Sequence, residues 1–241
     1  MSQGFAVGGL TVRYYGLILG LAIVTGYLVA RENAWRFGLG TDSVDRFAFW
    51  AIIVSFICAR LYFVLFELDY FSNNPAGILR IWEGGVSIYG AIIGGFLFAL
   101  LYSRGKAFSA WQLLDLAALS MPLAQAIGRF GNFVNYEAYG SETNLPWKMF
   151  VPETGAFHHP TFLYEAIANL SVFVILFRYR GRLKPGNLAL LYVMAYALVR
   201  FLIEPLRVDS VFVSGFRADQ VVSALVFLLA AGVFFSRKSR A

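Results

Sequence analysis

The chain has 241 residues, of which 59% are hydrophobic and only 14% are charged. Soluble domains carry about 25% charged residues, and a soluble fold of this composition would have too few polar residues to cover its surface. Several apolar runs approach or exceed the roughly 20 residues that cross a bilayer as a helix. The composition therefore excludes a soluble globular domain and predicts a polytopic membrane protein.

Seven apolar segments predict an all-α integral membrane protein with about seven transmembrane helices. They cover about 13–30, 47–66, 86–102, 110–127, 161–177, 187–204 and 217–235. Between the fourth and fifth segments, the more polar stretch at about 128–160 predicts a small head outside the cytoplasm. No internal repeat is evident, so 1–241 is interpreted as a single polytopic membrane domain.

Basic residues gather in four segments that lie on one side of the membrane if there are seven spans. Together these hold 12 of the 20 Lys and Arg residues: Arg31, Arg36, Arg46, Arg104, Lys106, Arg178, Arg180, Arg182, Lys184, Arg237, Lys238 and Arg240. Because Lys and Arg are enriched in cytoplasmic loops, we expect a cytoplasmic C-terminus and an outside N-terminus and head. Topology thus accounts for the net charge of +6, and no nucleic-acid partner is inferred.

The stretch 128–140 is the most informative polar segment. It combines Arg129, Asn132, Asn135 and Glu137 with three glycines, directly beside apolar sequence. Glycine lets backbone N–H groups approach a ligand closely, and the planar arginine fork matches phosphate geometry. The segment predicts a site for an anionic head group. The alternative is a glycine-rich turn whose arginine merely meets lipid phosphates.

Charged residues also fall within the apolar spans or at their edges. They are Arg13, Arg60, Asp115, Glu165, Arg200 and Glu204. Each costs roughly 2.5–3.5 kcal/mol on insertion scales when placed centrally. Such a set predicts a polar cavity inside the bundle, and the alternative is mutual pairing that only fixes helix register.

The sixth span carries the densest charge pattern. Arg200, Glu204 and Arg207 are spaced i, i+4 and i+7, so they share one face of a continuous helix. Pro205 limits the helix because it lacks a backbone donor. A salt bridge accounts for two of these charges, and the second arginine, left unpaired, predicts a bound anion.

Four other positions also stand out, and for some of them the sequence allows both a functional and a structural role. His159 precedes the fifth span and is placed facing the head, or it is a helix-capping or interfacial histidine. Tyr89 points into the polar cavity or belongs to an aromatic belt, and Tyr15 lies near the outer surface, where interfacial tyrosine is common. Cys58, the only cysteine, is expected to pack. No metal-ligand motif is present, so neither a metal nor another cofactor is expected.

Taken together, these motifs resemble those of the prolipoprotein diacylglyceryl transferase family. The resemblance rests first on Gly128-Arg129-x-Gly131-Asn132-Phe133-x-Asn135-x-Glu137-x-x-Gly140. Further matches, in the family's order, are Arg13-Tyr14-Tyr15-Gly16-Leu17, Ala59-Arg60-Leu61-Tyr62-Phe63-Val64-Leu65-Phe66, Trp82-Glu83-Gly84-Gly85 with Gly90 and Gly94, His159-Pro160-Thr161-Phe162-Leu163-Tyr164-Glu165, and Arg200-Phe201-x-x-Glu204-x-x-Arg207-x-Asp209. They extend over essentially the whole chain.

The resemblance implies a reaction in the bacterial cytoplasmic (inner) membrane. An enzyme of this family moves a diacylglyceryl group from phosphatidylglycerol to the lipobox cysteine thiol of a prolipoprotein signal peptide. Glycerol phosphate leaves and a thioether forms, as the first step of lipoprotein modification. The alternative is a non-enzymatic lipid- or anion-binding membrane protein or a transporter, although no inverted repeat is evident.

The resemblance also implies roles for particular residues. Negative charge grows on the departing phosphate, and Arg129 and Arg200 are placed to stabilise it. The catalytic set is Arg129, Arg200, Glu204 and Tyr89. The substrate-binding set is Tyr15, Arg60, Asn132, Asn135, Glu137, Gly140, His159, Glu165 and Arg207.

The acceptor of the thiol's proton stays open between Glu204, Glu137, His159 and Tyr89. Many family members carry histidine at the position of Tyr89, and that histidine has been considered a proton acceptor. An unperturbed tyrosine titrates near pH ~10 and is a poor base at neutral pH. Tyr89 is therefore expected to orient substrate through its hydroxyl, with the base elsewhere, unless nearby arginines lower its pKa.

Overall fold

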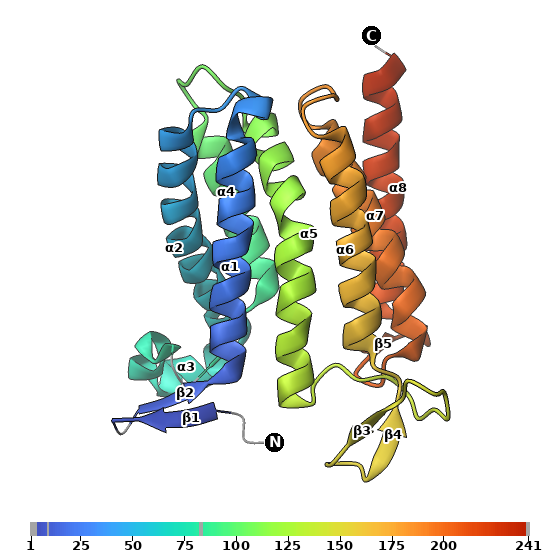
Figure 1. Ribbon diagram of the computed structural model, residues 1–241. Coiled ribbons are helices and arrows are strands. Elements are labelled where there is room, and N and C mark those ends of the chain that lie inside the picture. The colour runs from blue at the N-terminus through green and yellow to red at the C-terminus, as the bar shows by residue number, and fades with distance from the viewer. Residues whose placement is uncertain (1–3, 9, 82–83, 240–241) are drawn as a thin grey trace. The chain divides into compact units, whose positions relative to one another are not determined.

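The computed structural model describes residues 4–8, 10–81 and 84–239 (Figure 1). Trp82 and Glu83 of the third-span motif and Arg240 of the basic tail lie outside the described residues, as does the side chain of Lys238. The chain is mostly helical and forms two compact units, Met1–Ala30 with Asp115–Ala241, and Arg31–Leu114.

The larger unit combines helices with three short antiparallel hairpins. Its helices are most of α1 (Tyr14–Asn33) and α5 (Ala110–Asn135), together with α6 (Thr161–Tyr179), α7 (Asn187–Ile203) and α8 (Ala218–Ser239). A 3₁₀ turn, η4 (Glu204–Leu206), follows α7. The hairpins are β1 (Gly4–Val7) with β2 (Leu10–Arg13), β3 (Met149–Val151) with β4 (Ala156–His158), and β5 (Phe212–Val213) with β6 (Phe216–Arg217).

The smaller unit is built on two helices that approach closely. It contains η1 (Ala34–Phe37), α2 (Thr41–Phe66), α3 (Leu68–Asn73), η2 (Pro75–Leu79) and α4 (Ile88–Tyr102). A Cβ atom added to Gly90 would lie 2.4 Å from the Cys58 carbonyl oxygen, and one added to Gly94 would lie 2.5 Å from Cys58 Cβ. Small residues thus let α4 pack against α2, and Cys58 packs in this contact as expected.

Among the described residues, five helical segments are long and apolar enough to cross a membrane. They are Tyr14–Phe37, Thr41–Phe66, Thr161–Tyr179, Asn187–Leu206 and Ala218–Arg237. They confirm a helical membrane protein. The expected third and fourth spans coincide with α4, which is apolar but has only 15 residues, and with α5, which is not among the five.

Helix α5 extends further than the sequence predicts. We expect a helix that ends near 127, whereas α5 continues to Asn135, so Arg129 and Asn132 lie on a helix rather than in a turn. Gly131 serves packing there, because a Cβ atom would lie 2.8 Å from Cδ2 of Tyr15 on α1. The glycines of this segment are therefore compatible with a helix that has a close neighbour.

A tight cap ends α5 and starts the head. The N–H of Tyr136 donates to the Phe133 carbonyl at 3.2 Å, and the N–H of Glu137 donates to the Asn132 carbonyl at 2.9 Å. These are the two hydrogen bonds of a Schellman cap. Tyr136 and Ala138 adopt positive φ angles of 55° and 54° without being glycine, a conformation that is disfavoured for bulky residues. The segment is held in this shape by its contacts with the rest of the unit.

Candidate functional site

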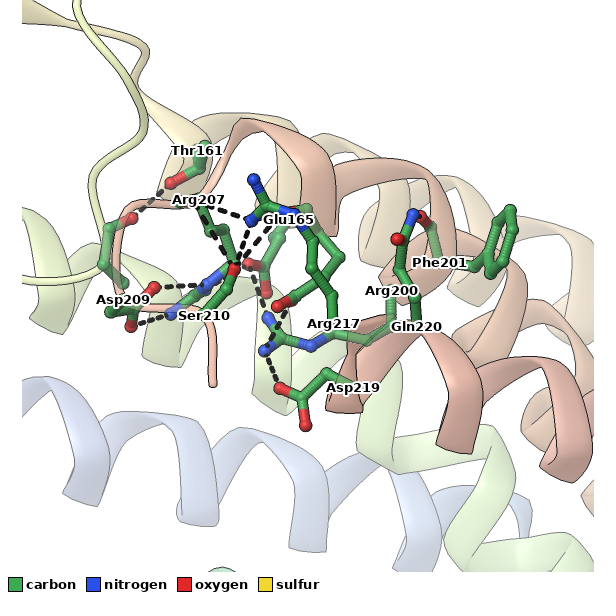
Figure 2. A network of polar contacts seen from close by, with 12 residues as sticks. Thr161, Glu165, Arg200, Phe201, Arg207, Asp209, Ser210, Arg217, Asp219 and Gln220 are labelled. Atoms are coloured by element: carbon green, nitrogen blue, oxygen red, sulfur yellow. Dashed lines mark hydrogen bonds and ion pairs between the residues drawn. The ribbon is translucent and has the colours of Figure 1, made fainter. Parts of the chain in front are cut away.

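The carboxylate of Glu165, near the start of α6, is shared by three arginines. Arg200 and Arg207 are seen beside it in Figure 2. Arg207 Nη1 lies 2.9 Å and Arg200 Nη1 lies 3.8 Å from Glu165 Oε1, while Arg129 pairs with the other carboxylate oxygen. The Glu165 side chain is only 4% exposed. A buried charge is tolerated when it is paired, so this carboxylate ties α5 and α7 to α6.

Glu204, the first residue of η4, is fully buried at 0% exposure. Arg200 Nη2 lies 2.9 Å from its Oε2 atom, yet neither carboxylate oxygen has an aligned hydrogen-bond donor among the described residues. The contact is therefore a charge pair without hydrogen-bond geometry. Buried acceptors without donors are rare and costly, so the Glu204 carboxylate keeps unused hydrogen-bond acceptors inside the cluster.

Arg207 is paired, contrary to the sequence prediction. Helix α7 ends before Glu204, and Arg207 has extended backbone, so it does not continue the helical face of Arg200. Its guanidinium forms a fork with Asp209, with Nε–Oδ1 and Nη2–Oδ2 distances of 2.9 and 2.5 Å, in addition to its contact with Glu165. The prediction of an unpaired second arginine is wrong, because the chain turns after the helix and brings Asp209 alongside.

The Arg207–Asp209 pair is stabilised in its ionised form. Burial raises the pKa of the Asp209 carboxyl, but hydrogen bonding and the charge of Arg207 outweigh that effect, so its pKa lies below the ordinary value. Burial likewise lowers the pKa of Arg207, and its carboxylate partners more than compensate. Both groups are charged at neutral pH.

Two further charged residues, Arg217 and Asp219, join the cluster without having been singled out in the sequence. Arg217 Nη1 donates to the carbonyls of Glu204 and Arg207 at 3.0 and 3.1 Å, and to Ser210 Oγ at 2.5 Å. Asp219 accepts a hydrogen bond from Arg200. Their signal in the sequence is position, since both charges fall in the first turn of the seventh apolar segment.

Gly140 of the head lies in close contact with the turn after α7. Its N–H donates to the His159 carbonyl at 2.9 Å, and the N–H of Ser141 donates to the Leu206 carbonyl at 2.7 Å. A Cβ atom at Gly140 would lie 2.7 Å from that Leu206 oxygen. His158 Nδ1 donates to the Gly140 carbonyl at 2.7 Å. The contact fixes the backbone next to Arg207.

The polar residues of the 128–140 segment form two separate pairs. Arg129 Nη1 donates to Asn132 Oδ1 at 3.4 Å, so Asn132 lies beside the charged cluster. Asn135 Nδ2 donates to Glu137 Oε1 at 3.1 Å, and Glu137 is exposed. The structure thus brings Asn132, but not Glu137, to the arginines.

His159 is part of a hydrogen-bonded chain at the start of α6. Trp147 Nε1 donates to Tyr164 Oη at 2.8 Å, and Tyr164 Oη lies 3.2 Å from His159 Nδ1. Because an indole N–H can only donate, the tyrosine oxygen accepts from Trp147 and its proton is available for the histidine. His159 thus has a defined partner on one ring nitrogen.

Arg60 belongs to the smaller unit and is committed to its own loop. Its Nη1 donates to the carbonyls of Gly84 and Gly85, both at 2.7 Å, its Nε to Ile78 at 3.0 Å and its Nη2 to Gly77 at 2.6 Å. A guanidinium has five N–H donors, so these four bonds use nearly all of them. Arg60 thereby fixes the segment that leads into α4.

Tyr89, in the first turn of α4, is 54% exposed, and its ring centroid lies 6.2 Å from that of Tyr62. In the larger unit, Tyr15 is 37% exposed beside Gly131.

Asp115 is explained by helix capping rather than by a polar cavity. Its carboxylate accepts hydrogen bonds from the backbone N–H groups of Gly186 at 2.6 Å and Ala189 at 2.8 Å. These donors open α7, whose first-turn N–H groups have no partner within the helix. Arg13, at the end of β2, is exposed. Of the six charged span residues, Glu165, Arg200 and Glu204 converge.

The fold and the cluster define a class: a helical membrane protein that presents several arginines and buried carboxylates in one place. A family model described as prolipoprotein diacylglyceryl transferase matches residues 3–236. The chain therefore belongs to that family, as its motifs predict.

Named relatives agree with this assignment over most of the chain. The chain is 44% identical to phosphatidylglycerol–prolipoprotein diacylglyceryl transferase of Acaryochloris marina over 233 residues, which is 92% of this chain and 85% of the relative. It is 44% identical to the Thermotoga maritima protein of the same name, covering 93% and 80% of the two chains. The Listeria monocytogenes serotype 4b protein of that name is 40% identical, with 97% and 88% covered.

Proposed function

We propose that this chain transfers the diacylglyceryl group of phosphatidylglycerol to the lipobox cysteine thiol of prolipoproteins. It is a transferase of lipoprotein biosynthesis, as its family and its relatives are. The observation that supports the chemistry best is the convergence of Arg129, Arg200 and Arg207 on one buried carboxylate in a membrane protein of this family. The family match favours this enzyme over a lipid-binding protein or a transporter.

In the proposed reaction, the thiol sulfur attacks the glyceryl carbon that carries the phosphate. The carbon–sulfur bond forms as the carbon–oxygen bond to phosphate breaks, so glycerol phosphate leaves with one more negative charge. Arg129 and Arg200 are 22% and 19% exposed in their side chains, so both are accessible at the edge of the cluster. Guanidinium groups placed where charge develops stabilise the transition state.

Glu204 is our proposed acceptor for the thiol proton. Its oxygens are buried and lack aligned donors among the described residues, and Arg200 keeps a positive charge beside it. Glu137 is exposed and bonded to Asn135, while one nitrogen of His159 is already engaged. A buried carboxylate beside the phosphate-binding arginine is positioned best for general-base catalysis.

The remaining site residues are proposed to support the head group. Asn132 lies beside Arg129, and Tyr15 and Tyr89 each present a partly exposed ring. Gly140 is proposed to act through close packing. For Arg60, its four carbonyl contacts support a positioning role rather than direct binding of phosphate.

We further propose seven spans in the cytoplasmic membrane, with the N-terminus and the 128–160 head outside. In the larger unit, Arg237 donates to the Pro185 carbonyl, so the basic tail and the basic 178–186 loop share one end. In the smaller unit, Tyr102 Oη donates to the Ser43 carbonyl at 2.9 Å, which joins the ends of its two basic segments. Both contacts fit a common cytoplasmic side.

A reconstituted reaction tests the function. Purified protein is incubated with phosphatidylglycerol and a peptide that carries a lipobox cysteine, and the peptide mass and the released glycerol phosphate are measured. We expect one diacylglyceryl adduct and one glycerol phosphate per peptide. A serine-substituted peptide and phosphatidylcholine as donor serve as controls. If folded wild-type protein forms no adduct on the peptide, the proposal is rejected.

A further inference from the structure

The arginines of the cluster are already neutralised in the absence of substrate. Four guanidinium groups, those of Arg129, Arg200, Arg207 and Arg217, lie among four carboxylates, those of Glu165, Glu204, Asp209 and Asp219. Figure 2 shows Arg200 with Asp219 and Arg207 with Asp209. Because the four positive charges are matched by four negative ones, a phosphate that enters this cluster brings a negative charge in excess of the positive charges there. A bound phosphate must therefore take the place of one carboxylate.

Asp219 is the carboxylate that can leave at the lowest cost. Glu165 and Glu204 are 4% and 0% exposed in their side chains, so neither can move into water. Asp209 is more exposed but is held to Arg207 by two hydrogen bonds in a fork. Asp219 is 37% exposed and contacts Arg200 through one carboxylate oxygen.

The position of Asp219 also stabilises it after release. It lies in the first turn of α8, where the free backbone N–H groups and the helix dipole favour a negative charge. The packing of α8 on α7 does not depend on Asp219 alone, because Gln220 Nε2 donates to the Phe201 carbonyl at 3.2 Å. Asp219 can therefore release Arg200 while the two helices stay together.

Within the described part of the chain, Arg200 makes one side-chain contact that has hydrogen-bond geometry, and its partner is Asp219. The contacts of Arg200 with Glu165 and Glu204 are charge pairs, at 3.8 and 2.9 Å. Asp219 thus occupies one of the five guanidinium N–H donors of Arg200 that a phosphate oxygen could use. From this we infer that Asp219 is an internal counter-ion of Arg200 that the phosphate of the lipid substrate displaces.

This inference rests on the proposed function and adds a determinant of substrate affinity. A head group without a negative phosphate cannot replace Asp219, because Arg200 would lose its partner without gaining another. Asp219 therefore lowers the affinity for every ligand at Arg200, and it excludes neutral ones. Removing its charge is expected to tighten phosphate binding, a gain that loss of a merely structural contact would not produce.

The test uses Asp219→Asn, which keeps the side-chain shape and removes the charge. Binding of short-chain phosphatidylglycerol to the purified full chain in a non-ionic detergent is measured by calorimetry. A partly exposed ion pair contributes up to about 1 kcal/mol, so we expect the dissociation constant to fall about threefold to fivefold. Gln220→Ala, which removes the neighbouring uncharged contact between the same helices, should leave the constant unchanged.

A dissociation constant in Asp219→Asn that equals or exceeds that of the wild type overturns the inference. Arg200→Gln reports separately on the proposed function, since it should weaken binding of the lipid whatever Asp219 does. Wild-type affinity in Arg200→Gln would reject the phosphate site itself. Inorganic phosphate is the second probe. If Asp219→Asn tightens inorganic phosphate but not the lipid, the site serves a free anion and the inference for the lipid is wrong.

Discussion

At the scale of single residues, the cluster is organised around shared carboxylates rather than isolated ion pairs. Glu165 receives three guanidinium groups and is almost fully buried. Such an arrangement keeps the arginines fixed before substrate arrives, which lowers the cost of reorganisation during reaction. Each arginine is therefore expected to contribute through its position as well as its charge.

Arg129→Ala and Arg200→Ala are expected to abolish measurable transfer. Each removes a charge-assisted contact to the departing phosphate, and loss of one such donor typically lowers the rate ~10²–10³-fold. Arg→Lys variants keep the charge but lose the fork, so they should retain partial activity. A thermal unfolding curve first checks that each variant is folded, and its turnover with the lipobox peptide is then measured. Near-normal turnover in either alanine variant would remove that arginine from the mechanism.

Glu204→Gln and Tyr89→Phe distinguish the proton acceptor from an orienting hydroxyl. Loss of a general base lowers the rate ~10²–10⁴-fold, which we expect for Glu204→Gln. Loss of one neutral hydrogen bond costs roughly 1 kcal/mol, so the rate of the Tyr89→Phe variant should fall only several-fold. Rates between pH 6 and 9 provide the check. A collapse of the rate in Tyr89→Phe, with loss of the basic limb of its profile, would assign the base to the tyrosine instead.

At the scale of elements, two backbone contacts determine where the functional side chains lie. The head contacts the turn after α7 at Gly140, and Arg60 fixes the loop that leads into α4. Neither residue needs to touch substrate to affect activity. We propose that both act through the placement of a neighbouring segment.

Gly140→Ala should destabilise the protein by about 1–3 kcal/mol and lower activity, because its Cβ atom would meet backbone and cannot be accommodated without a shift. The nearest atom is the Leu206 carbonyl oxygen, at 2.7 Å. Gly128→Ala is the matched control, since no atom lies within 4 Å of its added Cβ and alanine favours a helix. Thermal unfolding and turnover are measured for both. Equal tolerance of the two substitutions would contradict the close-contact role.

Arg60→Lys should loosen residues 77–81 and 84–87 while leaving phosphatidylglycerol affinity nearly unchanged. A lysine keeps the charge but cannot reach carbonyls on several sides as the guanidinium does. Hydrogen exchange of the amides of these residues should become faster, and turnover should fall. If lipid affinity falls at least tenfold while exchange is unaffected, Arg60 binds the head group directly.

At the scale of the whole molecule, the basic segments predict which face is cytoplasmic. Single cysteines at Ser141 and Arg182, in a chain whose Cys58 is replaced by alanine, report on the two sides. We expect a membrane-impermeant thiol reagent to label Ser141→Cys in intact cells and Arg182→Cys only after the membrane is opened. Both positions are exposed. Labelling of Arg182→Cys from outside would reject the orientation.

Much of this protein could be predicted from its sequence. Composition indicated a membrane protein, and the motifs around Arg129, Glu165 and Arg200 indicated the family that the comparisons confirm. The i, i+4 spacing of Arg200 and Glu204 also predicted their contact. These are properties of apolar length, of local helical periodicity and of residue type, which require no knowledge of how distant segments meet.

Tertiary structure alone decided which charges become partners. Arg207 contacts Glu165 and Asp209 because helix α7 ends before Glu204 and the chain then turns. Arg60 donates to the carbonyls of a loop rather than to a ligand. Asp115 caps a helix whose N-cap residue, Gly186, lies 71 residues further along the chain. Such contacts depend on where each helix ends and on how the following segment folds back. Spacing along a single helix does not reveal where the helix ends or how the next segment folds back. The sequence by itself could therefore identify these charged residues as unusual but could not predict their partners.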